Sequence, residues 1–248
     1  MNITIWNEYH PKHQNGKTAK VYPNGIHNVI KDIFKDNPDC TVRCATQEEP
    51  ENGLTDKVLD ETDVLIWWGE LWHENVLDSV VDKVCNRVLQ GMGILFLHSS
   101  NESKPFKKLM GTTCSLKWRD DGESERLWTI NPSHPIAYGV PETFTLEQEE
   151  MYGEFFDIPT PDELVFLGWF AGGEVFRSGV TFRRGYGKIF YFQPGHATYP
   201  VYYDKNIQKI IYNAVLWASP TAPARPILSS TYTQKTKIKR LFKWNKSV

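Results

Sequence analysis

Five of the seven histidines in this 248-residue chain follow segments whose apolar pattern predicts β-strands. They are His10, His13, His73, His98 and His196. Neutral imidazole is the commonest metal ligand in proteins, and it transfers protons near neutral pH. One such histidine could be structural. Five at strand ends predict a site for metal binding or acid–base catalysis, provided that the strands end at one edge of a sheet.

The stretch GILFLHSS, residues 93–100, places His98 directly after a predicted buried strand. In many hydrolases a serine or cysteine nucleophile stands at this point, in the pattern Gly-x-Ser/Cys-x-Gly. Here Leu97 and Ser99 flank the histidine, so the nucleophile pattern is absent. Activation of Ser99 by a nearby base remains an alternative.

Carboxylates could supply the other half of such a site. The stretch LEQEEMYGEFFDIP, residues 146–159, contains four glutamates, and we expect Glu150 and Tyr152 to point inward from a loop. A glutamate beside histidines could complete a metal site with an open position for water or substrate. It could equally act as a general base without a metal.

Aromatic and polar side chains at the same strand ends could bind a substrate. Trp67 and Trp68 end the third predicted strand, where a flat apolar surface would suit the CH face of a sugar ring; core packing is the alternative. We expect Glu8, Ser99 and Tyr199, which also follow predicted strands, to contact the substrate.

Strand-like and helix-like patterns alternate through the first half of the chain. Residues 9–25 are rich in proline and glycine and are expected to form a loop. The alternation predicts an α/β protein with a doubly wound, mostly parallel sheet, in which ligands bind beyond the carboxyl ends of the strands. The predicted strands are 3–8, 40–45, 63–69 and 93–99, and the predicted helices are 26–34, 76–89 and one beginning near Lys104.

The second half predicts an antiparallel excursion, because its apolar segments are separated by the glycine-rich turns AGG and GYG. We expect the last of its strands to rejoin the main sheet and a helix over 207–217 to close a domain of residues 1–218. Residues 219–248 are predicted to be a proline-rich linker and a basic extension. The antiparallel strands are 164–170, 174–184 and 188–194.

Composition and charge exclude several classes of protein. The net charge is −2, and residues 219–248 contain seven Lys or Arg and no Asp or Glu, so residues 1–218 carry −2 − 7 = −9. An acidic body is not typical of a nucleic-acid-binding domain. The absence of a long apolar run predicts no membrane span, and the N-terminus lacks the features of a secretory signal, which predicts a cytoplasmic protein. No GxGxxG or P-loop motif supports a nucleotide cofactor.

Six motifs extend from the third predicted strand to the last. They are WWGELWHENV (67–76), VLQGMGILFLHSS (88–100), HPIAYGVP (134–141), EEMYGE (149–154), GGEVFRSG (172–179) and GKIFYFQPGHATYP (187–200). Together they resemble the trehalose utilization (ThuA-like) family over roughly residues 2–218. The resemblance implies a flavodoxin-like fold similar to that of class I glutamine amidotransferases. Those enzymes carry a cysteine where this chain has Leu97-His98-Ser99, so glutaminase chemistry is not implied.

The resemblance also implies site residues, which we expect to be catalytic: His10, His98, Glu150, Tyr152 and His196. His73 belongs to the branch of the family with a WWG motif. The expected ligands of a divalent metal such as zinc are His73, His98, Glu150 and His196.

One position departs from the family pattern. Many relatives resemble WWGH where this chain has Glu70. Either a carboxylate replaces an imidazole ligand there, or the pocket is more acidic.

The family is linked to the catabolism of trehalose and related disaccharides, with keto-sugar intermediates. We therefore expect acid–base or metal-assisted chemistry on a keto-sugar or glycoside. The alternatives are an amidotransferase-like hydrolase that uses Ser99 with His196, and a non-catalytic sugar-binding protein. We expect a homo-oligomer with a small sugar as its substrate.

Overall fold

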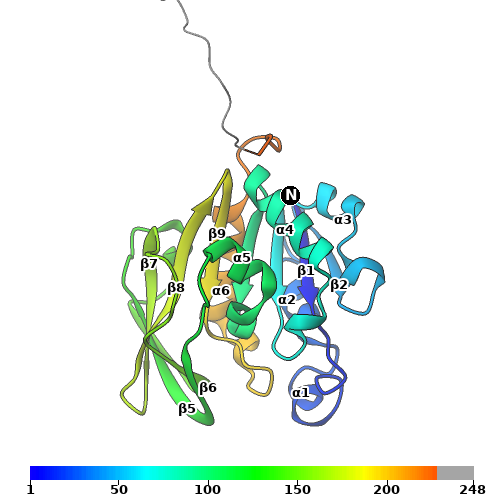
Figure 1. The fold of residues 1–248 in the computed structure, drawn as a ribbon. Coiled ribbons are helices and arrows are strands. Elements are labelled where there is room, and N and C mark those ends of the chain that lie inside the picture. Colours follow the sequence, from blue (N-terminus) through cyan, green and yellow to red (C-terminus); the bar gives the residue numbers. More distant parts are fainter. Residues whose placement is uncertain (228–248) are drawn as a thin grey trace, which may run out of the picture.

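The computed structural model of the chain describes residues 1–227, and one nine-stranded sheet runs through them (Figure 1). The first five strands in spatial order are parallel, and the other four are antiparallel. The order is β2 (Thr41–Thr46), β1 (Asn2–Asn7), β3 (Val64–Trp68), β4 (Gly93–Leu97), β9 (Gly187–Phe192), β8 (Val175–Arg184), β7 (Glu163–Phe170), β5 (Lys117–Thr129), β6 (Thr143–Gly153).

This arrangement confirms the predicted mixed α/β class, its parallel core and its antiparallel strands. The last apolar strand, β9, rejoins the sheet as expected, because it pairs in parallel with β4. Strands β3 and β4 are buried at every position, which explains their uninterrupted apolar sequences. The flavodoxin-like topology stays a prediction.

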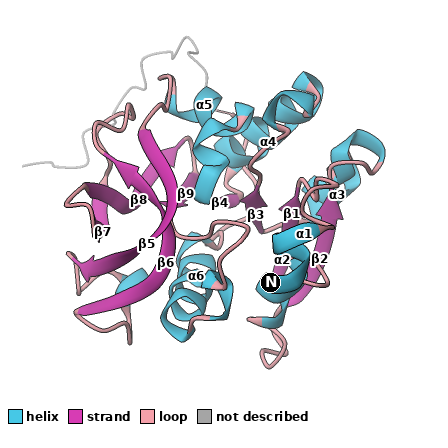
Figure 2. Cartoon of the chain, turned by 90° about the horizontal axis from the view of Figure 1, so that it is seen from below, coloured by secondary structure: helices cyan, strands magenta, loops and turns pink. Residues whose placement is uncertain are grey.

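Helices cover both faces of the sheet, as Figure 2 shows. Apolar residues of α3, α4 and α5 join one hydrophobic core, and those of α2 and α6 join a second core. Burial of these apolar helix faces against the sheet is the main source of stability. The helices are α1 (Gly16–Val21), α2 (Ile26–Asp32), α3 (Asp56–Glu61), α4 (Asp78–Gln90), α5 (Lys104–Met110) and α6 (Lys205–Ala218).

Two regions differ from the prediction. Residues 9–25 contain the short helix α1, which has one buried residue, Thr18, and therefore no apolar periodicity to reveal it. Residues 143–153 form strand β6 rather than a loop, and β6 pairs with β5. Strand β5 is polar and mostly exposed or half-buried, and β6 ends in a continuous buried run, residues 149–153, that includes two glutamates, so neither strand shows the apolar alternation of a half-buried strand.

The described part of the C-terminal extension, residues 219–227, has no regular secondary structure. The backbone N–H of Arg225 donates to the carbonyl of Gln90, which holds this segment against the end of α4. The rest of the predicted basic extension lies outside the described residues. Within residues 1–227, no helix combines the length and apolar character needed to cross a membrane.

Candidate active site

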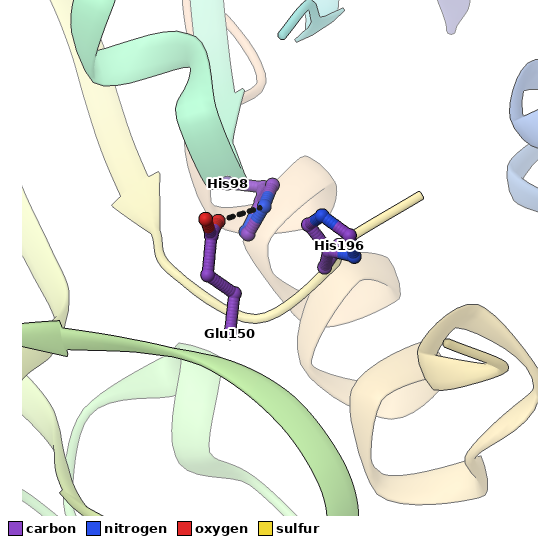
Figure 3. Close-up of side chains that lie close together, drawn as sticks. All are labelled: His98, Glu150 and His196. Atoms are coloured by element: carbon purple, nitrogen blue, oxygen red, sulfur yellow. Dashed lines mark ion pairs between the residues drawn. The ribbon is translucent and has the colours of Figure 1, made fainter. Parts of the chain in front are cut away.

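The site lies at the carboxyl edge of the parallel strands. Because β1, β3, β4 and β9 are parallel neighbours, the segments that follow them meet at one edge. These segments supply His13, Glu70, His98 and His196. Of the five histidines predicted to converge at this edge, the fold links His13, His98 and His196 through Glu70 and direct ring contact. Strand β6 adds Glu150 from the antiparallel part of the sheet (Figure 3).

His98 is fully buried and tightly constrained. Its Nδ1 lies 2.9 Å from the carbonyl oxygen of Gln193, which can only accept, so Nδ1 carries a proton. Its Nε2 lies 3.0 Å from Oε2 of Glu150, yet the two form no aligned hydrogen bond. Burial by itself would lower the pKa of His98, but Glu150, with Glu149 and Glu70, raises it to about 9. The protonated, cationic form of His98 is therefore favoured beside Glu150.

Glu150 and its neighbour Glu149 have different roles. Glu150 lines the cavity described below. Glu149 is fully buried, and it accepts hydrogen bonds from the backbone N–H groups of Gly195 at 2.7 Å and His196 at 3.1 Å. Burial raises the pKa of Glu149 despite these bonds. Glu149 thus fixes the turn that presents His196.

His196 lies beside His98, with the two ring centroids 5.4 Å apart. Its Nδ1 accepts from the backbone N–H of Thr198, so its Nε2 carries the proton and lies 3.3 Å from Oε1 of Glu70. Burial would lower the pKa of His196, but hydrogen bonding to Glu70 raises it. Glu70 therefore acts from the rim of the site as a partner of His196.

A chain of alternating carboxylates and imidazoles continues behind Glu70. Nε2 of His13 lies 3.0 Å from Oε2 of Glu70, and its Nδ1 lies 3.5 Å from Glu8. Glu8 is 1% exposed and accepts from the backbone N–H groups of Leu71 and Trp72. Glu8 thus holds the loop that carries Glu70. It does not line the cavity, although the sequence predicts that Glu8 contacts the substrate.

A cavity of about 380 Å³ opens above these residues. Its polar lining includes Ser99 and Tyr152, whose hydroxyl oxygens lie 2.9 Å apart. No hydrogen bond joins Ser99 to His196 among the described residues, so the serine-hydrolase alternative gains no geometric support. Four carboxylates also line the cavity: Glu70, Glu102, Asp120 and Glu150.

Besides Glu8, Tyr199 and the buried His98, four other expected site residues lie away from the cavity lining. Trp67 and Trp68 are both 0% exposed: Trp67 stacks on Trp6, and Nε1 of Trp68 donates to the carbonyl of Gly195. Because both side chains are buried, neither offers a surface to a sugar ring, and the structure does not support the expectation that they bind substrate. His10 packs against Trp72, with ring centroids 4.1 Å apart.

His73 is the fourth. Burial lowers its pKa to about 4, and it is not part of the compact histidine–glutamate group. That group is His98, Glu150 and His196, whose potential ligand atoms all lie within 4.8 Å of one another.

Tyr199 lies at the edge of the site, and its hydroxyl donates to Asp120 at 2.7 Å. Sequence reasoning misses Asp120 and Trp118, which both line the cavity. The polar pattern of their strand, β5, carries no strand signal. The pairing of Trp118 with Tyr152 across the two strands is visible only in the structure.

These features define an α/β protein with a buried histidine–glutamate site at the carboxyl edge of its sheet. The family model described as trehalose utilisation, ThuA, matches residues 2–218. The chain therefore belongs to the ThuA family. A comparison of the sequence with curated proteins finds no match.

Solved structures support the fold. A putative ThuA-like protein from Parabacteroides merdae has a TM-score of 0.64 at 15% identity, over 90% of this chain and 92% of its own. A second, from Bacteroides uniformis, has a TM-score of 0.63 at 14% identity, over 88% and 91%. A protein described as cytoplasmic, from Salmonella typhimurium, has a TM-score of 0.60 at 11% identity, over 88% and 100%. At these identities the likeness concerns the fold alone.

Proposed function

We propose that this protein transfers a proton next to the carbonyl of a keto-sugar, in the catabolism of trehalose or a related disaccharide. The observation that carries this proposal is the buried pair of His98 and Glu150, 3.0 Å apart, with Glu150 facing a cavity large enough for a sugar. Membership of the ThuA family supports a carbohydrate substrate.

The chemistry assigns one role to each side chain. The Glu150 carboxylate takes a proton from the carbon beside the carbonyl, and the electron pair of that C–H bond forms the carbon–carbon double bond of an enediolate. The N–H group of His196 Nε2 stabilises the negative enediolate oxygen. Glu150 then returns the proton to a carbon of the enediolate, and His98 holds Glu150 in place. Tyr152 and Ser99 offer hydroxyl groups to those of the sugar.

A divalent metal such as zinc fits the same residues. His98, Glu150 and His196 offer two nitrogens and one oxygen, a donor set typical of catalytic zinc. Nε2 of His98 is a buried nitrogen without an aligned hydrogen-bond partner, and it would lose its proton when it bound the metal. When bound, the metal would polarise the substrate carbonyl as a Lewis acid. Metal-free and metal-assisted proton transfer use the same three side chains.

Turnover of 3-keto-disaccharides by purified protein tests the proposal, together with metal analysis. We expect Glu150→Gln and His98→Ala to lower kcat by about 10²-fold or more. The matched control is Glu147→Gln, on an exposed residue of the same strand. Wild-type turnover in both site variants would rule out the proposed roles.

We also propose a cytoplasmic location, which the description of the Salmonella structural relative supports. A homo-oligomeric state stays a prediction.

A further inference from the structure

Besides its carboxylates, the cavity has apolar lining residues, and Trp118 is the most exposed of them. The Trp118 side chain is 66% exposed, whereas Leu71 is 44% exposed and Leu116 is partly buried. A large exposed aromatic surface in a cavity wall is unfavourable in water unless a ligand covers it.

The register of the sheet fixes Trp118 beside the reactive residues. Trp118 on β5 is paired with Tyr152 on β6, so the two side chains lie on the same face of the sheet. Glu150 is two residues from Tyr152 on the same strand and shares that face. The indole is therefore a neighbour of the site and lies on its solvent side.

The charge of the cavity restricts what can enter it. Four of its lining residues are carboxylates, and none of the lining residues that the structure describes is Lys or Arg. One carboxylate, Glu102, forms an ion pair with Lys107 at 2.6 Å. Among the described lining residues His196 alone can carry a positive charge, and its Nε2 already lies 3.3 Å from Oε1 of Glu70. A phosphate or carboxylate group on the ligand would therefore meet this negative field without an unpaired cationic partner.

We infer that the cavity takes an uncharged, unphosphorylated sugar, one ring of which stacks on Trp118: the lining carboxylates disfavour charged sugars, and Trp118 determines the affinity for the ring. The inference rests on the proposed function for the reaction that follows binding. The binding of the sugar itself does not depend on that function. The CH face of the ring covers the indole, while the ring hydroxyls donate to the surrounding carboxylates. Trp118 acts on binding and leaves the proton-transfer step to Glu150.

The test compares the wild type with Trp118→Ala and Trp118→Phe on a 3-keto-disaccharide and on the same sugar carrying a phosphate. We expect Trp118→Ala to raise KM about tenfold, which corresponds to about 1.4 kcal/mol, with little change in kcat. Trp118→Phe should retain most of the affinity, because it keeps an aromatic face. The phosphorylated sugar should bind at least about tenfold more weakly than the neutral one, and added salt should narrow that gap.

Trp169→Ala is the matched control, because Trp169 is also exposed, at 48%, but lies on β7 and does not line the cavity. An unchanged KM in Trp118→Ala, or a preference for the phosphorylated sugar, would overturn the inference. If the wild type still turned over the keto-disaccharide, the proposed function would stand. Calorimetry with the unreacted disaccharide separates the two claims. Binding that depends on Trp118 without any turnover of keto-sugars would sustain the inference and overturn the proposed function.

Discussion

Glu150 and His98 face each other at 3.0 Å although their strands are far apart in the sheet. In spatial order β9, β8, β7 and β5 all separate β4, which leads into His98, from β6, which carries Glu150. The antiparallel part of the sheet must therefore curl back over the ends of the parallel strands, as the curved β5–β6 pair in Figure 2 shows. This curl encloses the site, and one wall of the cavity is therefore formed by β5 and β6, which lie outside the parallel core.

The compact group of three potential ligands, His98, Glu150 and His196, predicts how added zinc changes thermal stability. If zinc binds the folded protein alone, a concentration of 100 times Kd adds about 2.7 kcal/mol to the free energy of unfolding. For a chain of this size the expected rise in Tm is about 5–10 °C. His98→Ala and His196→Ala should abolish the rise, which differential scanning calorimetry would record.

His73→Ala is the informative control for that measurement. The sequence predicts His73 among the ligands, but it is not part of the group formed by His98, Glu150 and His196. The variant should keep the zinc-dependent rise in Tm. Loss of the rise in His73→Ala alone would contradict this ligand assignment.

Gly195 is predicted to be intolerant of a side chain. Its φ is +140°, and a Cβ atom there would overlap the buried hydroxyl of Tyr202. We expect Gly195→Ala to lower the free energy of unfolding by about 2–4 kcal/mol and to displace His196. Urea denaturation measures the loss.

Gly139→Ala separates backbone strain from steric overlap. Gly139 also has a positive φ, +70°, but a Cβ atom added there would have no neighbouring atom within 4 Å. Its replacement should cost only about 1 kcal/mol. Equal losses at the two positions would show that overlap with Tyr202 is unimportant.

The ion pair of Glu154 and Arg177 predicts a pH-dependent contribution to stability. Two guanidinium nitrogens of Arg177 lie 2.8 and 2.9 Å from the Glu154 carboxylate. Burial would raise the pKa of Glu154, but the bonds to Arg177 lower it below the ordinary value of 4.5. The stabilisation is therefore fully present above about pH 4.5 and is lost as the pH falls through the lowered pKa of the folded protein.

Glu154→Gln should cost about 1 kcal/mol at pH 7. The difference from the wild type should shrink below about pH 4.5. Chemical denaturation of both proteins from pH 7 to pH 3 measures it. A difference that stays constant over this range would show that the charge of Glu154 does not contribute.

The parallel core and its site can be predicted because apolar periodicity is a local signal. That signal places His98 and His196 at strand ends, and the parallel arrangement brings them together. It cannot reveal β5 and β6, because polar residues such as Glu125 and Glu149 are buried in them and break the apolar pattern, so the sequence suggests a loop for Glu150 and gives no role to Trp118. Nor can it separate Trp67 and Trp68 from exposed tryptophans, because strand ends and buried strands have similar compositions. Long-range pairing decides these positions.

Deuterium exchange tests the central claim most directly. A 3-keto-disaccharide is incubated with the protein in D₂O, and NMR follows deuterium incorporation at the carbons beside the carbonyl. Wild-type protein and Glu147→Gln should exchange that hydrogen at equal rates, and Glu150→Gln should be slower by about 10²-fold or more. Failure of the wild type to exchange it, or equal rates in wild type and Glu150→Gln, would contradict proton transfer by Glu150.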